Sequence, residues 1–267
     1  MRGVYDETAY DETAYDETPL MMKPAMTISK AVLLAAGRGT RMESLTDDCP
    51  KPMLPLQGRP LLAHQIERLE EAGVRQILVV TGYKAEIVEQ YFDLHPAAVA
   101  EIHFQVQAQQ DGTGSAARLA RNFVGQDPFL LTYGDILVEP KVYESLFERL
   151  EDAEAALTVK DIDDPYRGAA VYVDDDKVTR IIEKPPRGSS TTRWVNAGVY
   201  CFRPSVFDEL DRIPLSPRGE YELTDAVIQM LRKGVKFGWL PIDGFWKDVG
   251  RPEDLREAAE FVDGGSA

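Results

Sequence analysis

The feature that most constrains this chain is an apolar run that leads directly into a glycine-rich loop. Residues 32–36 (Val-Leu-Leu-Ala-Ala) are followed by residues 37–41 (Gly-Arg-Gly-Thr-Arg), and Lys51 stands between two prolines ten residues later. Glycines let backbone N–H groups approach phosphate oxygens closely, and cations neutralise the charge that grows during phosphoryl chemistry. The segment is therefore suited to holding a triphosphate.

Two well-known glycine loops do not match this segment. The dinucleotide-binding fingerprint requires a third glycine three residues after the second, and Met42 occupies that place. The P-loop requires Gly-Lys followed by Ser or Thr, and no such tripeptide follows. Taken alone, the loop is equally compatible with an ordinary turn between a strand and a helix.

Composition narrows the partners that the chain can take. The 267 residues carry a formal net charge of −15, which argues against nucleic acid because a phosphate backbone demands a basic surface. An acidic shell can still surround a local cationic cleft for small anionic substrates. No apolar run approaches the ~20 residues of a membrane span, and the two cysteines, Cys49 and Cys201, form no metal-ligand pattern. We therefore expect a cytoplasmic protein with free thiols and with no nucleic acid or membrane partner.

The first 25 residues differ from the rest of the chain. The repeat Tyr-Asp-Glu-Thr-Ala begins at Tyr5, recurs at Tyr10 and recurs again, ending in proline, at Tyr15. This acidic repeat has no apolar periodicity and buries too little surface to offset chain entropy. We expect residues 1–25 to be a disordered leader or an added tag, and residues 26–267 to form the folded domain.

The periodicity of the folded part predicts an α/β protein. In the first half, strands are expected at 30–36, 76–81, 101–107 and 129–133, with helices at 60–72, 84–92 and 112–123. In the second half, strands are expected at 155–159, 169–173, 178–183 and 195–202, with helices at 205–210, 223–233 and 252–261. Strands that alternate with helices at this spacing imply a largely parallel sheet, whose ligands lie at the carboxyl ends of the strands.

Six motifs occur in order between about Lys30 and Val262. They are A-A-G-R-G-T-R-M, P-K-P-M, Q-A-Q-Q-D-G-T-G, Y-G-D, E-K-P with V-N-A-G-V-Y, and W-K-D-V-G. In this order they resemble the sugar-phosphate nucleotidyltransferases, also called nucleotide-sugar pyrophosphorylases. The resemblance implies a Rossmann-like three-layer α/β/α fold, with a mixed, mostly parallel sheet and a strand-rich sugar-binding half.

The resemblance also implies a reaction. In that family an oxygen of a sugar 1-phosphate attacks the α-phosphorus of a nucleoside triphosphate in line, and pyrophosphate leaves. No covalent enzyme intermediate is required, so catalysis consists mainly of positioning and of charge stabilisation by cations and Mg²⁺. The three histidines of the chain therefore need no catalytic role.

The resemblance assigns the nucleotide to the first half of the chain. Arg41 would bind the leaving β,γ-phosphates, and Lys51 would stabilise the α-phosphate. Gln107 and Gly112 would read the edge of the nucleobase, since an amide side chain both donates and accepts hydrogen bonds. The implied nucleotide-binding residues are Ala35, Ala36, Gly37, Gly39, Thr40, Arg41, Gln107, Gly112 and Thr113.

Two aspartates are the candidate ligands of Mg²⁺. Asp135 ends the expected strand in Y-G-D, and Asp248 lies in W-K-D-V-G. Mg²⁺ prefers one or two carboxylates, several waters and substrate phosphate oxygens, so two aspartates from distant strands meet its needs. Asp135 completes the candidate catalytic set with Arg41 and Lys51.

The resemblance assigns the sugar phosphate to the second half of the chain. Glu183 would contact sugar hydroxyls, and Lys184 would contact the sugar phosphate. Asn196 and the backbone at Gly168 would complete the sugar pocket. Arg218, before Gly-Glu, matches an arginine that contacts the sugar phosphate in some thymidylyl members of the family.

The nucleobase and the sugar stay open. The loop 107–116 is most similar to the N-acetylglucosamine-1-phosphate uridylyltransferases, but those enzymes commonly have asparagine in place of Asp248. Arg251 replaces the threonine of the usual D-x-G-T-P motif, and the opening segment also resembles mannose 1-phosphate guanylyltransferases. UTP is the first choice, with TTP, GTP and CTP as alternatives.

Two alternatives come from other functional classes. One is a cytidylyltransferase that acts on a small alcohol phosphate, and the other is a non-catalytic regulatory subunit that binds nucleotide sugars. The sequence does not determine the oligomeric state, and a homo-oligomer is compatible with each of these functions.

Overall fold

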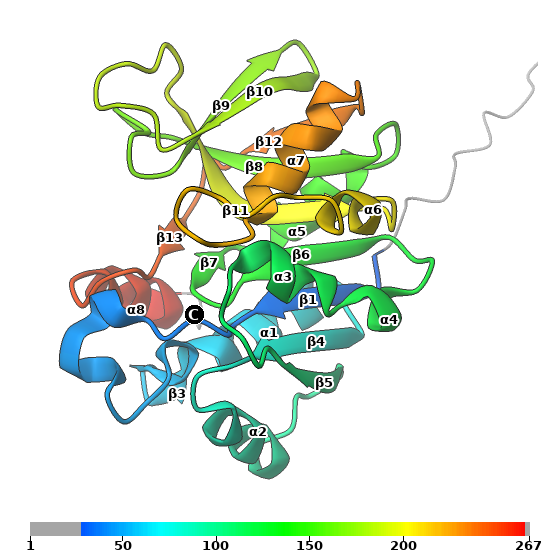
Figure 1. Ribbon diagram of the computed structural model, residues 1–267. Coiled ribbons are helices and arrows are strands. Elements are labelled where there is room, and N and C mark those ends of the chain that lie inside the picture. The colour runs from blue at the N-terminus through cyan, green and yellow to red at the C-terminus, as the bar shows by residue number, and fades with distance from the viewer. Residues whose placement is uncertain (1–27, 265–267) are drawn as a thin grey trace, which may run out of the picture.

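The computed structural model describes residues 28–264 (Figure 1). The expected leader, residues 1–25, therefore lies outside the described residues. Within the described range, no helix combines the length and the apolar character that a bilayer-spanning segment requires.

The first half of the chain alternates strands with helices. Its main strands are β1 (Lys30–Leu34), β4 (Gln76–Thr81), β5 (Glu101–Val106) and β6 (Phe129–Tyr133). Its helices are α1 (Leu61–Glu71), α2 (Ala85–Leu94), α3 (Thr113–Arg118) and α4 (Arg121–Val124). Short 3₁₀ helices at Thr40–Thr46 and Lys51–Met53, and a hairpin of β2 (Pro55–Leu56) and β3 (Arg59–Pro60), lie between β1 and α1.

The second half is richer in strands. They are β7 (Ile136–Val138), β8 (Ala155–Asp161), β9 (Ala169–Asp174), β10 (Lys177–Glu183), β11 (Trp194–Phe202), β12 (Phe237–Pro241) and β13 (Trp246–Asp248). The helices are α5 (Pro140–Glu148), α6 (Val206–Leu210), α7 (Leu223–Arg232) and α8 (Asp254–Gly264).

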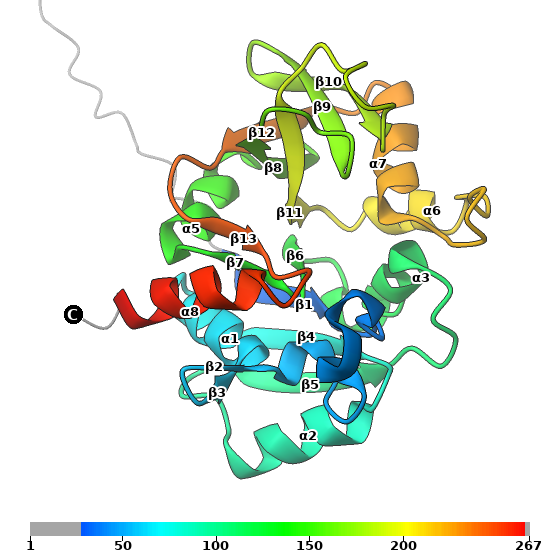
Figure 2. The same cartoon turned by 90° about the vertical axis from the view of Figure 1, so that its left-hand side faces the viewer.

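The main sheet of the described chain has nine strands and joins the two halves. Its path is β10-β9-β11-β6-β1-β4-β5, and β8 pairs with both β11 and β12. Pairings among β6, β1, β4 and β5 are parallel, whereas β11 runs antiparallel to β6, β8 and β9. The strand-rich half, with β9, β10 and β12, lies above β1, β4 and β5 in Figure 2.

Helices cover both faces of the sheet. Buried apolar side chains of α1, α2 and α5 form one core cluster on one face, and those of α3, α6 and α7 form another. The amphipathic spacing of Leu62, Ile66 and Leu69 explains why α1 lies on the sheet with these side chains buried. The structure confirms the predicted three-layer α/β/α fold with a mixed sheet and a strand-rich second half.

The structure differs from the expected elements in a few places. The helix expected at 112–123 is divided into α3 and α4, because Leu119 and Ala120 donate their N–H groups three residues back, to Ala116 and Ala117, which tightens the turn there. The strand expected at 30–36 ends at Leu34. The final helix, α8, begins two residues later than expected and runs on to Gly264.

Candidate active site

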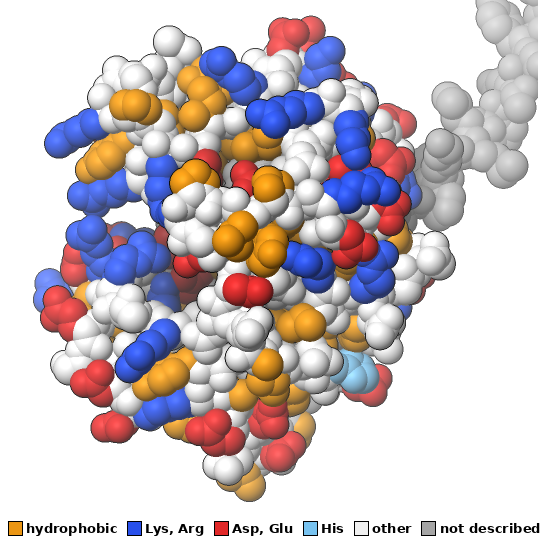
Figure 3. Space-filling view, in the orientation of Figure 1, with side chains coloured by type: hydrophobic (Ala, Val, Ile, Leu, Met, Phe, Trp, Pro, Cys, Tyr) orange, Lys and Arg blue, Asp and Glu red, His pale blue; other side chains and the backbone are white. Residues whose placement is uncertain are grey.

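A cavity of about 480 Å³ opens where β1 and β6 end. The carboxyl ends of parallel strands are the usual place for ligands in α/β folds. Figure 3 shows Lys and Arg side chains on both sides of a hollow between the two halves of the molecule. All the residues expected to contact the nucleotide, to act in catalysis or to bind metal line this cavity: Ala35, Ala36, Gly37, Gly39, Thr40, Arg41, Lys51, Gln107, Gly112, Thr113, Asp135 and Asp248.

The glycine-rich loop leaves β1 and turns at Gly39. The φ angle of Gly39 is +69°, and a Cβ atom there would lie 2.8 Å from the Cβ of Lys51. Glycine therefore permits both the left-handed backbone and the close approach to Lys51. The hydroxyl of Thr46 donates to the carbonyl oxygen of Gly39 at 3.2 Å. This hydrogen bond joins the last residue of the 3₁₀ helix Thr40–Thr46 to the residue before its start.

Lys51 is a buried cation held by its neighbours in the chain. Only 7% of its surface is exposed, and Pro50 and Pro52 beside it are buried as well. Its ammonium group forms an ion pair with the carboxylate of Asp135. Such a pair offsets part of the cost of removing each charge from water. Lys51 and Asp135 therefore line the cavity as an ion pair.

A two-stranded ribbon brings the two aspartates together. Strand β13 pairs antiparallel with β7, so that Asp248 lies opposite Ile136, the residue after Asp135. Val249 also donates its N–H to the carbonyl oxygen of Asp135 at 2.9 Å. Burial, and secondly the nearby Asp135 carboxylate, raises the pKa of Asp248 to about 6, while Lys51 and Arg41 act in the opposite direction. The two carboxylates are thus close enough to repel each other.

This pair of carboxylates fits a divalent cation. The Oδ1 atom of Asp248 is buried and has no hydrogen-bond partner in the described part of the chain. Mg²⁺ takes one or two carboxylates and completes its shell with waters and substrate phosphate oxygens. No group of three or more His, Cys, Asp or Glu that could hold a metal occurs within residues 28–264. Asp135 and Asp248 could hold Mg²⁺ together with oxygens from a ligand and waters.

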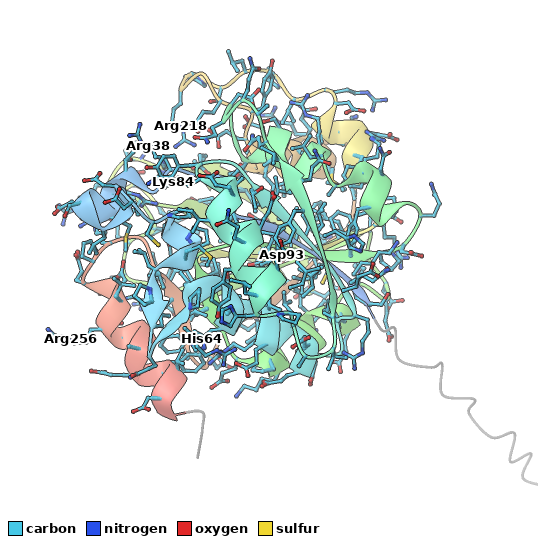
Figure 4. All side chains as sticks on the ribbon, turned by 90° about the horizontal axis from the view of Figure 1, so that it is seen from below. Arg38, His64, Lys84, Asp93, Arg218 and Arg256 are labelled. Atoms are coloured by element: carbon cyan, nitrogen blue, oxygen red, sulfur yellow. The ribbon has the colours of Figure 1, made fainter. Side chains whose placement is uncertain are left out.

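Further cations lie in or beside the glycine-rich loop. The guanidinium of Arg41 lies beside Gly250, where a Cβ atom would be 3.6 Å from its Nη1. Arg38 lies over the ring of Tyr83, 5.3 Å from its centroid. In Figure 4, Arg38, Lys84 and Arg218 appear on the same side of the molecule. Of the cations in this part of the chain, Arg41 and Lys51 line the cavity and would meet an anionic ligand there.

The side chain of Gln107 is buried and held in one orientation. Its amide nitrogen donates to the carbonyl oxygen of Gly112 at 3.0 Å and contacts the Ser115 hydroxyl at 2.9 Å. The reversed amide would put Oε1 against the Gly112 carbonyl, which can only accept a hydrogen bond. The Oε1 atom is therefore the group of Gln107 that remains to accept a hydrogen bond from a ligand.

The residues expected to bind the sugar phosphate form a separate group. None of the five lines the cavity: Gly168, Glu183, Lys184, Asn196 and Arg218. Lys184 donates its backbone N–H to Gly168 at 2.9 Å, and Arg218 lies 3.7 Å from the Glu183 carboxylate. Burial raises the pKa of Glu183, and the charges of Arg218 and Lys184 oppose this shift. Gly168 thus directly precedes β9 and Glu183 ends β10, whereas Asn196 lies within β11 and Arg218 in the loop before α7.

Several lining residues were not expected from the sequence. Tyr133, Gly134, Gln110 and Glu220 all line the cavity. Tyr133 and Gly134 belong to the Y-G-D motif, of which only the aspartate was singled out. Glu220 follows Arg218 by two residues, so its loop reaches both the cavity and the sugar-phosphate group.

Comparison with known proteins agrees with the motif resemblance. The family model described as "Nucleotidyl transferase" matches residues 30–264. The chain is 37% identical over 229 residues to the "Bifunctional protein GlmU" of Methanococcus maripaludis strain C5, covering 85% of this chain and 53% of that relative. It is 35% identical over 235 residues to the "UTP--glucose-1-phosphate uridylyltransferase AglF" of Haloferax volcanii, covering 86% of this chain and 95% of that relative.

Solved structures agree on the fold. A UDP-glucose pyrophosphorylase complexed with UDP-glucose superposes with a TM-score of 0.79 at 22% identity, over 89% of this chain and 99% of that chain. HddC from Yersinia pseudotuberculosis superposes with a TM-score of 0.71 at 26% identity, over 88% of this chain and 100% of that chain. The chain spans about half the length of the GlmU relatives that it matches. Because the family model covers most of the chain, this protein belongs to the nucleotidyl transferase family.

Proposed function

We propose that this protein transfers a nucleotidyl group from a nucleoside triphosphate to a sugar 1-phosphate and releases pyrophosphate. The observation that carries the proposal is the meeting of Arg41, Lys51, Asp135 and Asp248 in one cavity at the end of a parallel sheet. Two cations beside two carboxylates suit a triphosphate with its Mg²⁺, and none of these groups needs to form a covalent intermediate.

Each charged side chain has a distinct part in the proposed mechanism. The Gly37–Thr40 backbone and Arg41 bind the β,γ-phosphates, which leave as pyrophosphate. Lys51 stabilises the negative charge at the α-phosphate, where the sugar phosphate attacks. Asp135 and Asp248 would hold Mg²⁺, which neutralises phosphate charge when bound. Asp135 also keeps the buried Lys51 ammonium oriented.

UTP is the proposed triphosphate. The Oε1 atom of Gln107 can accept the N3–H of uracil, because its amide nitrogen is already used by Gly112 and Ser115. Thymine presents the same N3–H, so this contact alone does not separate UTP from TTP. The AglF relative, which is named a UTP--glucose-1-phosphate uridylyltransferase, and the loop at 107–116 favour uridine.

A hexose 1-phosphate is the proposed acceptor. Glu183 and Asn196 would hydrogen bond sugar hydroxyls, and Lys184 and Arg218 would pair with the phosphate. The position of Arg218 supports this, because its guanidinium lies 3.7 Å from Glu183 and pairs with Glu222 at 2.6 Å, so that a cation lies next to the carboxylate proposed to bind the sugar. A sugar there would present its phosphate toward the α-phosphorus held by Lys51.

The test is a matrix of UTP, TTP, GTP, CTP and ATP against a panel of sugar 1-phosphates, with Mg²⁺ and pyrophosphate release as the readout. We expect the highest kcat/KM for UTP with a hexose 1-phosphate. Phosphocholine with CTP tests the alcohol-phosphate alternative. Tight binding of a nucleotide sugar without pyrophosphate release in any combination would refute the transferase and favour the regulatory alternative.

A further inference from the structure

Arg118, the last residue of α3, has a partly buried guanidinium. Its Nε and Nη2 atoms are buried and have no hydrogen-bond partner in the described chain. The guanidinium lies 4.7 Å from the ring centroid of Tyr221. Burying such a group is costly unless another interaction compensates it, and the face of the Tyr221 ring is the partner that compensates it here.

The backbone of Tyr221 is hydrogen bonded to the loop that faces the proposed nucleobase. Tyr221 donates its N–H to the carbonyl oxygen of Asp111, and Gly114 donates its N–H to the carbonyl oxygen of Tyr221, both at 2.7 Å. Leu223 donates its N–H to the hydroxyl of Thr113 at 3.0 Å. The position of the loop is therefore set by a segment that follows it by more than 100 residues in the chain.

The backbone contacts between Tyr221 and residues 111–114 leave little room for either segment to move. A Cβ atom at Gly112, whose φ is +123°, would lie 2.3 Å from the carbonyl oxygen of Tyr221. Gly112 and Thr113 line the cavity, and so does Glu220, the residue before Tyr221. A displacement of Tyr221 would therefore move the backbone that lines the nucleotide side of the cavity.

We propose that Arg118 is a positioning residue for nucleobase selection, which acts through Tyr221 and does not touch the substrate. The guanidinium fixes the Tyr221 ring, the Tyr221 backbone fixes residues 111–114, and these residues present Gly112 and Thr113 to the base. The inference rests on the proposed function, because only a nucleotide in the cavity gives this loop something to select.

The test replaces Arg118 by Met, which keeps the length of the side chain and removes its charge. Calorimetry on the full chain measures the affinity for each Mg²⁺-bound triphosphate without a sugar phosphate, and pyrophosphate release measures KM and kcat. We expect R118M to weaken binding of the preferred triphosphate by about tenfold and to reduce its preference over the other triphosphates. The kcat at saturating substrate should change much less than KM.

Variants of the ring separate positioning from general stability. Tyr221→Leu removes the ring and should weaken triphosphate binding as much as R118M does. Tyr221→Phe keeps the ring and should retain most of the wild-type affinity. The double variant R118M/Y221L should bind no more weakly than either single variant, because both remove the same interaction. Arg121→Met is the matched control, since Arg121 lies 5.1 Å from the ring centroid of Phe207 and does not line the cavity.

The outcomes are distinct. If R118M lowers the melting temperature but leaves affinity and base preference unchanged, Arg118 is only structural and the inference is wrong. If the wild-type protein binds triphosphates without releasing pyrophosphate, the proposed function fails while the binding comparison still tests Arg118. If the wild-type protein binds no triphosphate, both proposals fail.

Discussion

At the scale of single residues, the cavity depends on charges that compensate one another. The buried Lys51 pairs with Asp135, and Asp248 lies beside Asp135 with one buried oxygen that has no hydrogen-bond partner among residues 28–264. Removing one member of a buried pair leaves the other charge without compensation. A substitution here should therefore affect both the phosphate chemistry and the local stability.

Asp135→Asn tests the metal assignment. The amide keeps the shape of the side chain but removes the charge that pairs with Lys51 and that we propose holds Mg²⁺. We expect kcat to fall by roughly 10²–10³, measured by pyrophosphate release, while circular dichroism shows a folded protein. Asp176→Asn, in the exposed turn between β9 and β10, is the matched control and should keep full activity. Near-wild-type turnover in Asp135→Asn would contradict the assignment.

His64 gives the stability a predictable dependence on pH. It is 3% exposed, its Nε2 lies 2.9 Å from the carbonyl oxygen of Leu56, and burial lowers its pKa. In the unfolded chain the imidazole of His64 has the ordinary histidine pKa of about 6.5. As the pH falls, this imidazole is therefore protonated in the unfolded chain before it is protonated in the folded protein. The stabilisation by neutral His64 is therefore complete above about pH 6.5 and is lost as the pH falls through the lower folded pKa.

We expect the melting temperature of the wild-type protein and that of His64→Gln to depend differently on pH. Between about pH 7 and pH 5, the melting temperature of the wild-type protein should fall more steeply than that of His64→Gln. His95 is exposed, so His95→Gln should keep the wild-type slope. Parallel curves for the wild type and His64→Gln would show that His64 does not contribute to the acid sensitivity.

At the scale of elements, the sequence predicted long apolar segments well and short ones poorly. Strands β4 and β6 have the predicted bounds, and each contains a run of at least three successive apolar residues. Strands β7 and β13, of three residues each, were not predicted, because three residues show no periodicity. Helix α5 was missed as well, although its buried positions follow helical spacing.

The same limit applies to the candidate site. Motif resemblance identified Asp135 and Asp248 one by one, but their proximity depends on the β7–β13 pairing. That pairing is set by tertiary contacts such as the hydrogen bond from the Trp246 indole to Ala197 at 2.8 Å. The proposed role of Tyr221 in positioning residues 111–114 could not be predicted from the sequence, because its contacts with Asp111 and Gly114 are made by the backbone.

Asp254 of α8 should control the position of Asp248. Its carboxylate accepts the N–H groups of Gly250 at 3.0 Å and Arg251 at 2.8 Å, and it pairs with Lys247 at 2.9 Å. We expect Asp254→Ala to raise the Mg²⁺ concentration needed for half-maximal activity and to destabilise the protein by about 1 kcal/mol, as the loss of a helix cap does.

A Mg²⁺ titration of activity and a denaturant titration measure the two effects. Asp263→Ala, at the exposed end of the same helix, is the control that should change neither. If Asp254→Ala loses stability but keeps the wild-type Mg²⁺ dependence, then α8 supports the fold without positioning the aspartate.

At the scale of the whole molecule, individual cations in and near the cavity contrast with the acidic charge of the chain. The chain has a net charge of −15, yet Arg41, Lys51 and the proposed phosphate contacts Lys184 and Arg218 are cations. Self-repulsion of a strongly charged protein destabilises the compact state, while cations placed at the binding site attract anionic ligands. The two effects respond to salt in opposite directions.

Raising the ionic strength should therefore stabilise the fold and weaken substrate binding in the same samples. The Debye length shortens from about 30 Å at 0.01 M salt to about 3 Å at 1 M, which screens the surface repulsion and the attraction at the cavity opening. We expect the melting temperature to rise over this range, while KM rises for both anionic substrates and kcat changes little.

Lys184→Gln should reduce the salt dependence of KM for the sugar phosphate, while the control Lys236→Gln, on the exposed surface, should not. A KM that does not respond to salt would mean that substrates bind only through contacts formed deep in the cavity, such as those of the buried Lys51.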